Sequence, residues 1–330
     1  MRAMMCQAIS DSIGGLMLMD LPTPVPDTGE VRVRLAAASV NFPDLLMLQG
    51  KYQFRPPLPF APGLEAAGVV DALGNNVDPQ WLNKPVIVGA RYGCYAESIV
   101  VPVSALRPKP APFSFEQAAS YGAAYLTAYV GLVCRGHLAV GETLLVHGAA
   151  GGVGLAAVAL GKLLGAQVIA TGGSDAKLAL VKAAGADHVI NYTKADGSLG
   201  GFRQAVKDLT GGRGADVIYD PVGGDVFDES SHCIAWGGRL LVIGFAGGRI
   251  SNIDVNWPLI KGYSIVGVRA GEFGRRNPEL GNANQRALAT LAEEGKISPY
   301  IFASLPLEQA NEAQALLAER KVVGKVVITM

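Results

Sequence analysis

Apolar and polar residues follow two different patterns along this chain, and the pattern changes after roughly its first third. In the later part, six apolar runs of strand length are separated mostly by segments with the spacing of helices. These runs cover residues 143–147, 167–170, 187–191, 216–219, 239–243 and 264–268. Strands that alternate with helices in this way predict an α/β fold built on one doubly wound parallel sheet.

The first 110 residues have the shorter period of β-structure. Residues 31–35 alternate between apolar and charged side chains, and residues 68–74 and 84–89 are short strand-like runs bounded by glycine. Further helices are predicted over 115–122, 127–135, 284–295 and 307–318, with strands near 301 and over 325–329. The closing segment is too small to fold alone. We therefore predict a β-rich domain of residues 1–124 that residues 270–330 complete, and a sheet domain of residues 125–269.

A cluster of small residues joins the first two strands of the predicted sheet. It follows the run 143–147 directly, and a helix is predicted over 155–165 before the next strand. It reads A-x-G-x-x-G, one residue away from the turn that binds a dinucleotide pyrophosphate through N–H groups at a helix start. The strand–turn–helix–strand order favours this function over a plain turn without a ligand. The predicted contacts in this Rossmann domain are Ala150, Gly151, Gly152, Val153 and Gly154.

Composition narrows the class of protein. The 330 residues are 50% hydrophobic and 17% charged, with 42 glycines and no formal net charge. Neutral charge gives no reason to expect nucleic acid or a membrane surface as a partner, and no apolar run reaches the ~20 residues of a spanning helix. The N-terminus lacks a signal peptide's apolar core, and the four cysteines are spread singly. We expect a cytoplasmic, two-domain enzyme with reduced and mostly buried thiols.

Six ordered motifs make the chain similar to one family of proteins. They read SVNFPD from residue 39, PGLEAAG from 62, AAGGVG from 149, GADHVINY from 185, YDPVGG from 219 and GKVVI from 324. Together they extend over nearly the whole chain and resemble the zinc-free quinone oxidoreductases of the medium-chain dehydrogenase/reductase superfamily. The resemblance implies a GroES-like catalytic domain, a Rossmann domain, an NADPH cofactor and a homodimer.

The metal ligands of the zinc-dependent relatives are missing. Those relatives carry cysteine where this chain has Asn41 and histidine where it has Leu64, and neither side chain here supplies a thiolate or an imidazole. The lobe with four closely spaced cysteines is also missing. The four histidines have no ligand spacing and are interpreted as ordinary core or surface residues: His137, His147, His188 and His232. We expect no metal.

The segment after the second predicted strand favours NADPH. NAD-selective Rossmann domains place an acidic residue there, whereas this chain continues with Gly172, Gly173 and Ser174. Asp175 comes later and is expected in the first turn of the next helix, with Ser174 as its N-cap. In the resembled reductases, a lysine and a tyrosine at the positions of Lys177 and Tyr192 hold the 2′-phosphate, together with glycine N–H groups. The alternative is a surface lysine and a packed tyrosine.

The predicted catalytic residues are Asn41, Asp44 and Tyr52. By resemblance, Asn41 faces the nicotinamide ribose and the substrate, and Tyr52 lies near the pocket, where its phenol could donate to a carbonyl or quinone oxygen. Asp44 would share a face with Asn41 if this segment forms a helical turn. Each residue also has a structural alternative: a cap for Asn41, a helix turn for Asp44 and packing for Tyr52.

Further cofactor contacts are implied at the ends of the later strands, where ligands gather in an open α/β sheet. Thr127 matches a position that contacts the nicotinamide end, and residues 244–247 are expected to form a loop beside it. The remaining predicted contacts follow strands or lie in the last motif: Val222, Gly244, Phe245, Ala246, Val268, Arg269 and Lys325.

These residues predict an NADPH-dependent, zinc-independent reductase that transfers a hydride to a conjugated carbonyl acceptor. A quinone, an enone, an enal and an enoyl thioester remain open as acceptors. The alternative from another class is an NADPH-binding structural or RNA-associated protein of the zeta-crystallin type with little catalytic activity. Neutral charge and the catalytic set favour the enzyme. The expected partners are this small substrate and a second copy of the chain, paired through the edge strand 264–268.

Overall fold

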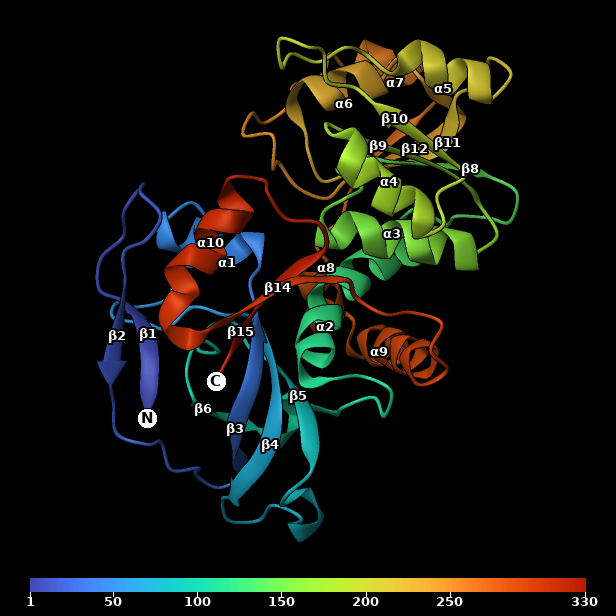
Figure 1. Cartoon of the computed structure of the whole chain (residues 1–330). Coiled ribbons are helices and arrows are strands. Elements are labelled where there is room, and N and C mark those ends of the chain that lie inside the picture. The colour runs from blue at the N-terminus through green and yellow to red at the C-terminus, as the bar shows by residue number, and fades with distance from the viewer. The chain divides into compact units, whose positions relative to one another are not determined.

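The computed structural model describes all 330 residues, which divide into two compact units (Figure 1). Unit 1 contains residues 1–123 and 292–330, and unit 2 contains residues 124–291. Our sequence analysis predicts the boundary at the C-terminal end of the second unit between residues 269 and 270, whereas the structure has it between residues 291 and 292. Residues 270–291 belong with unit 2 because they pack on its helices, and the Asn284 amide nitrogen lies 3.4 Å from the Cys134 sulfur.

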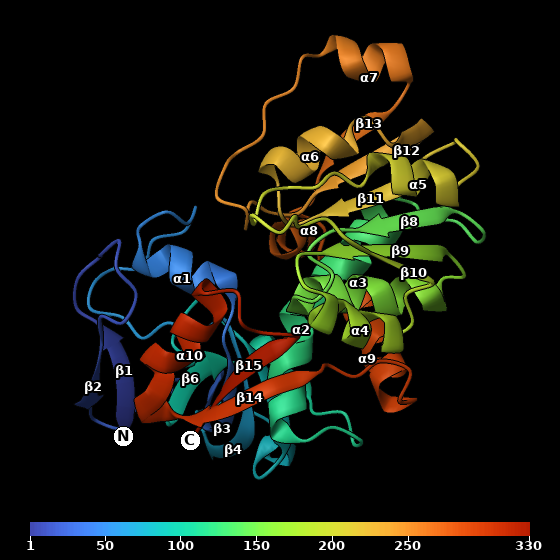
Figure 2. The same cartoon turned by 45° about the horizontal axis from the view of Figure 1, so that its top comes forward.

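Unit 1 is built on a seven-stranded sheet that combines five strands from residues 30–108 with the last two strands of the chain (Figure 2). Six strands follow the order β14-β15-β3-β4-β5-β7, and β6 pairs with β3. Their bounds are β3 (Glu30–Ser39), β4 (Glu65–Leu73), β5 (Pro85–Gly89), β6 (Ser98–Pro102), β7 (Leu106–Pro108), β14 (Ile301–Pro306) and β15 (Lys325–Thr329). Since Val327 of β15 pairs with Ser39 of β3, the last strand lies beside the start of the segment that carries Asn41.

A hairpin and short helices complete unit 1. The hairpin consists of β1 (Arg2–Cys6) and β2 (Leu16–Asp20), and α1 (Phe42–Leu48) follows β3. Near the C-terminus, the 3-10 helix η4 (Leu307–Gln309) leads into α10 (Ala310–Ala318), and two further 3-10 turns are η1 (Pro79–Trp81) and η2 (Val103–Ala105). Apolar side chains from the sheet, α1 and α10 share one buried core.

Unit 2 has the predicted doubly wound sheet. Its six strands are all parallel, in the order β10-β9-β8-β11-β12-β13. They are β8 (Thr143–Val146), β9 (Gln167–Gly172), β10 (His188–Asn191), β11 (Ala215–Asp220), β12 (Ile234–Val242) and β13 (Ser264–Gly267). The helices are α3 (Gly152–Leu163), α4 (Asp175–Ala183), α5 (Arg203–Leu209), α6 (Gly224–Ser230), α7 (Asn256–Lys261), α8 (Ala270–Arg276) and α9 (Pro278–Glu293). In Figure 1, α3 and α4 lie on one face of this sheet, opposite α5 and α6.

The segment 115–135 differs from its prediction as two helices. It forms one continuous helix, α2 (Phe115–Tyr129), which runs directly into a π-helix, η3 (Val130–Arg135). The residues between the two predicted helices contain no proline, and two of them, Ala124 and Tyr125, are buried, so packing favours an unbroken helix. None of the helices in the structure combines the length and the apolar character needed to cross a bilayer.

Candidate functional site

The predicted cofactor contacts of unit 2 gather at one edge of its sheet. Because all six strands are parallel, their carboxyl ends meet at this edge. The turns and helix starts after these ends contain residues 150–154 (after β8), Gly173, Ser174 and Lys177 (β9), Tyr192 (β10), Val222 (β11), Gly244, Phe245 and Ala246 (β12), and Val268 and Arg269 (β13). The sheet thus brings together residues that are widely separated in the sequence.

The turn between β8 and α3 has space only for glycine at its last motif position. A Cβ added at Gly154 would lie 2.4 Å from the carbonyl oxygen of Gly148 and 2.7 Å from the Cα of Ala149. The Ala149 N–H donates to the Thr171 carbonyl at 3.1 Å and so fixes the turn on β9. Gly151 caps α3 without a side-chain hydrogen bond, so the N–H groups of the first turn remain for an anionic ligand. This cradle fits the pyrophosphate of a nicotinamide dinucleotide.

The segment after β9 contains the residues predicted to hold a 2′-phosphate. Ser174 is the N-cap of α4, and Asp175 lies in its first turn, as predicted. The Asp175 carboxylate accepts a hydrogen bond from Asn191 at 2.9 Å, so it is engaged by the strand beside it. Lys177 is half-buried, and burial lowers its pKa. The Tyr192 N–H donates to the Gly172 carbonyl at 3.1 Å, which brings the segments after β9 and β10 together.

The loops after β11 and β12 are stacked on each other. The buried Asp220 carboxylate accepts the N–H groups of Val222 (2.8 Å) and Gly223 (2.9 Å), and burial raises its pKa to about 6. The loop after β12 then donates the Ala246 N–H to the Pro221 carbonyl at 3.0 Å. These bonds hold the loop while the Phe245 side chain stays 40% exposed. An apolar ring is therefore presented at the same edge as the glycine turn.

In unit 1, Asn41 and Asp44 start helix α1, so the predicted helical turn is present. Asp44 Oδ2 accepts the Asn41 N–H at 2.8 Å and the Tyr95 hydroxyl at 3.2 Å, and its Oδ1 accepts the Gly63 N–H at 3.2 Å. The carboxyl is fully buried, and burial raises its pKa to about 7. Asp44 thus ties α1 to the loop before β4 and to Tyr95.

Glu65 is a site residue that our sequence analysis does not single out. It is 4% exposed, and its Oε1 accepts hydrogen bonds from Asn41 Nδ2 (3.1 Å) and Lys325 Nζ (3.4 Å). Its Oε2 accepts the Ala123 N–H of α2 at 2.7 Å. One feature of the sequence could have identified it: Glu65 is an acidic residue at the start of an otherwise apolar strand. A carboxylate that is buried there requires polar partners.

The side-chain amide of Asn41 has a fixed orientation. Lys325 Nζ, which can only donate, lies 2.7 Å from Oδ1, and the carboxylate of Glu65, which can only accept, lies beside Nδ2. The second Nδ2 hydrogen is directed to the Ser39 carbonyl at 3.3 Å. The Asn41 amide therefore has no donor left for a ligand, and its Oδ1 is engaged by Lys325 and, in the capping box of α1, by the Asp44 N–H. The Lys325 ammonium uses only two of its three donors. This cluster suits an electron-rich ligand oxygen at Lys325.

Two predicted contacts lie outside these groups. Tyr52 follows α1, is half-buried against the core of unit 1 and donates its N–H to the Leu46 carbonyl at 3.2 Å. Thr127 lies near the end of α2, in unit 2. The roles of both residues toward a ligand remain predictions.

His147 is a satisfied core histidine, as expected. Its Nδ1 and Nε2 lie 2.7 Å from the hydroxyls of Thr171 and Ser230. Ser230 donates its own hydrogen to the Val226 carbonyl, so Nε2 carries the proton and Nδ1 accepts from Thr171. Burial lowers the His147 pKa to about 3, which keeps the ring neutral.

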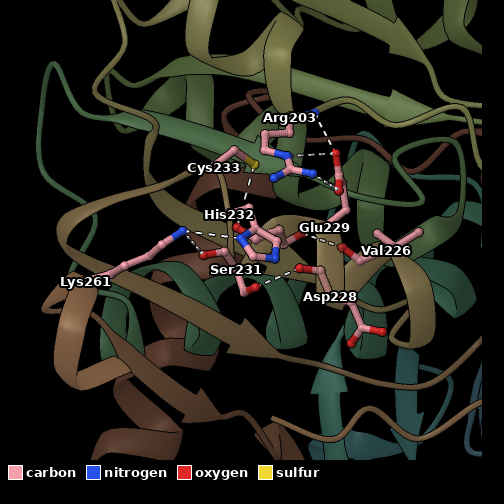
Figure 3. Close-up of polar contacts among 9 residues, drawn as sticks. Arg203, Val226, Asp228, Glu229, Ser231, His232, Cys233 and Lys261 are labelled. Carbon is pink, nitrogen blue, oxygen red and sulfur yellow. Dashed lines mark hydrogen bonds and ion pairs between the residues drawn. The ribbon is translucent and has the colours of Figure 1, made fainter. Parts of the chain in front are cut away.

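His232 lies at the amino end of β12, on the side of the sheet away from the glycine turn. Its Nδ1 is 3.5 Å from Lys261 Nζ, and the ion pair of Arg203 with Glu229 lies nearby (Figure 3). No group of three or more His, Cys, Asp or Glu side chains is placed to hold a metal ion. Zinc independence stays a prediction that rests on the chemistry of Asn41 and Leu64.

The raised pKa of Asp44 gives stability a defined pH dependence. The pKa is about 7 in the folded state against an ordinary value of 3.8, so the folded protein holds this proton more tightly than the unfolded chain. The contribution of Asp44 to the free energy of unfolding is therefore present below about pH 4 and is lost as pH rises toward 7. In Asp44→Asn the free energy of unfolding should fall less over this range. Urea denaturation at several pH values measures both slopes, and equal slopes would contradict the assignment.

Comparisons with known proteins agree with this geometry. The family model described as an alcohol dehydrogenase GroES-like domain matches residues 27–111, and the one described as a zinc-binding dehydrogenase matches residues 152–286. A quinone oxidoreductase-like protein 2 homolog of Nematostella vectensis is 39% identical over 99% of this chain and 88% of its own. The mouse quinone oxidoreductase-like protein 2 is 36% identical over 94% of this chain and 87% of its own.

Solved structures with similar folds include complexes with NADPH. A mycobacterial protein complexed with NADPH superposes with a TM-score of 0.90 at 31% identity, over the whole of both chains. The quinone oxidoreductase of Thermus thermophilus, also solved with NADPH, gives a TM-score of 0.85 at 30% identity, again over both whole chains. With the two domain types, the glycine turn and these relatives in place, the chain belongs to the quinone oxidoreductase-like proteins of the medium-chain dehydrogenase/reductase superfamily, and it is an oxidoreductase of that type.

Proposed function

We propose that this oxidoreductase uses NADPH to reduce a conjugated carbonyl compound, such as a quinone, an enone, an enal or an enoyl thioester, without zinc. The observation that carries the proposal is the edge of the unit 2 sheet, where a glycine-lined cradle, Lys177 and Tyr192 follow neighbouring strands and no carboxylate ends β9. The similarity to proteins solved with NADPH supports the cofactor. The similarity to quinone oxidoreductases supports the acceptor class.

Selectivity for NADPH would come from charge and hydrogen bonding near the end of β9. A 2′-phosphate is a dianion at neutral pH, and Lys177 and the backbone at Gly173 and Ser174 offer it positive charge and N–H donors. NADH has no such group and would gain nothing from Lys177. The carboxylate that does lie in this region, Asp175, is bonded to Asn191.

Replacing Lys177 with alanine should weaken the binding of NADPH about tenfold to a hundredfold, because a hydrogen bond to a charged group is lost. The affinity for NADH should stay nearly the same, and this comparison is the internal control. Fluorescence titration with each cofactor measures both constants. Equal affinity of the wild-type protein for NADH and NADPH would contradict the proposed selectivity.

The bound cofactor would supply the hydride. The chain itself therefore has to bind and orient the cofactor and to polarise the acceptor. The cradle after β8 would hold the pyrophosphate, and Phe245 would offer an apolar contact beside it. In unit 1, Lys325 offers a charged donor to an acceptor oxygen or a ribose, Asn41 holds that ammonium group in place, and Tyr52 could donate from its phenol. A conjugated acceptor suits this set, since its incoming charge is spread over several atoms and moderate donors suffice.

A screen of NADPH oxidation tests the proposed activity. Quinones, enones, enals and enoyl-CoA esters are offered in turn, and we expect turnover with at least one of these classes. Binding of NADPH without turnover of any of them would instead favour an NADPH-binding protein. The screen also identifies the acceptor class.

We further propose that the protein is a homodimer joined through β13. This strand ends the sheet and pairs on one side only, with β12. The Gly237 N–H donates to the Gly262 carbonyl, which places the end of α7 beside Trp236, and several apolar side chains here are exposed. They include Trp236 (78%), Leu259 (80%) and Ile260 (62%). An unpaired strand edge beside apolar surface favours pairing with a second copy.

Light scattering should give the mass of a dimer at micromolar concentration, and the substitution Ile265→Lys should shift it to that of a monomer. Ile265 lies in β13 and is 37% exposed, so a lysine there does not bury a charge in the core of the subunit. Its charge would oppose the pairing of two β13 edges. A wild-type protein that scatters as a monomer at all concentrations would contradict the dimer.

A further inference from the structure

The two carboxylate oxygens of Glu65 serve two different parts of the chain. Oε1 accepts from Asn41 Nδ2 (3.1 Å) and Lys325 Nζ (3.4 Å), and Oε2 accepts from the Ala123 N–H of helix α2 (2.7 Å). Both Glu65 and Lys325 are at most 5% exposed. One buried anion therefore ties helix α2 to the amide and the ammonium group that face a ligand in the proposed function.

A glycine in the middle of α2 allows the Glu65 carboxylate to lie close to the helix. Gly122 precedes Ala123 inside the helix Phe115–Tyr129, and glycine is the poorest helix former apart from proline. Within 4 Å of an added Cβ there is a single atom, Glu65 Oε2, at 3.0 Å. The position otherwise has room for a methyl group. Helix propensity therefore favours alanine at this position, and the approach of the Glu65 carboxylate is the feature that opposes it.

We propose that Glu65 is a positioning residue for the reaction and that Gly122 provides the clearance it needs. Glu65 orients Lys325 and Asn41, which in turn would meet the cofactor or the acceptor, so this inference rests on the proposed function. A carboxylate is required because the three groups that bond to it are all donors. Glutamine has one acceptor oxygen and one donor nitrogen, and the nitrogen would face a donor on one side or the other.

The substitution Gly122→Ala separates positioning from a purely structural role. The new methyl group should displace the carboxylate by a few tenths of an ångström, while the helix gains a better helix former. We expect kcat to fall about threefold to tenfold, since small errors in placing catalytic groups reduce rates. The KM for NADPH should change less than about twofold because unit 2 holds its phosphates. The melting temperature should stay the same or rise.

A matched control is Gly274→Ala in α8. It is also a helical glycine, but its added Cβ meets only the Cα of Gly281, at the ordinary contact distance of 3.6 Å. We expect its kcat to equal that of the wild type. An unchanged kcat in Gly122→Ala, or an equal loss in both variants, would overturn the proposal.

NMR of the side-chain amide of Asn41 tests the same inference without turnover. Displacement of Glu65 should shift the Asn41 Nδ2 proton resonances in Gly122→Ala and in Glu65→Gln, but not in Gly274→Ala. The exchange rate of the Ala123 amide hydrogen should also rise in Glu65→Gln. If the Asn41 resonances were unshifted in both Gly122→Ala and Glu65→Gln, the positioning role of Glu65 would be overturned. If the wild-type protein turns over no acceptor, the proposed function fails, whereas these measurements still decide the role of Glu65.

Discussion

Replacing Gly154 with alanine is expected to abolish measurable binding of NADPH and to lower the free energy of unfolding by about 1–3 kcal/mol. The new Cβ would lie 2.4 Å from the Gly148 carbonyl oxygen and 2.7 Å from the Ala149 Cα. Both are backbone atoms, so no side chain can rotate away. Helix α3 would have to move from the turn, which separates the N–H groups that would bind the pyrophosphate. Fluorescence titration and urea denaturation measure the two effects.

Gly151→Ala is the control for stability at the same turn. Its Cβ would meet the Gly148 carbonyl oxygen at 3.4 Å, an ordinary contact, so we expect the free energy of unfolding to stay near that of the wild type. Wild-type affinity for NADPH in Gly154→Ala would show that the cradle after β8 does not hold the cofactor.

The second large effect is expected from Lys325→Met, which should lower the free energy of unfolding by about 3–5 kcal/mol. Methionine keeps the length and apolar stem of the side chain but removes the ammonium group. The buried Glu65 carboxylate then loses its cation, and Asn41 Oδ1 loses the donor that lies 2.7 Å away. An uncompensated charge in the core costs far more than an exposed one. Chemical denaturation measures the loss.

Lys51→Met provides the comparison for an exposed pair. Lys51 Nζ lies 2.8 Å from Asp11, but both side chains are more than half exposed, so water replaces the contact and little change is expected. If Lys325→Met were as stable as Lys51→Met, the buried ion pair of Glu65 with Lys325 would not contribute to stability as we describe.

The parallel sheet could be predicted because its signal is local. Each strand of unit 2 is a short apolar run followed by a helix-forming segment, and all six predicted strands are present. The glycine turn and Ser174 as the N-cap of α4 could also be predicted, since both depend on residues close in sequence. The helical turn that carries Asn41 and Asp44 could be predicted for the same reason, because both residues start one helix.

The parts that were missed depend on contacts between distant residues. Glu65 has no local feature beyond its charge, and its partners are Asn41, Ala123 and Lys325 from three other elements. The break predicted within residues 115–135 is absent because burial of Ala124 and Tyr125 favours a continuous helix. The boundary at 269/270 followed the end of the last strand, whereas α8 and most of α9 pack with unit 2. Periodicity along the chain does not contain this information.

The most direct test of the proposed function compares two acceptors that differ by one double bond. Cyclohexenone and cyclohexanone are offered with NADPH, and kcat/KM is measured for each, with a quinone as a third acceptor. Reduction of an isolated ketone places a full negative charge on one oxygen, which zinc-dependent relatives stabilise with their metal. Asn41 and Leu64 leave this chain without those ligands. We predict turnover of the enone or the quinone and little turnover of the saturated ketone, whereas equal kcat/KM values for the ketone and the conjugated acceptors would contradict the account.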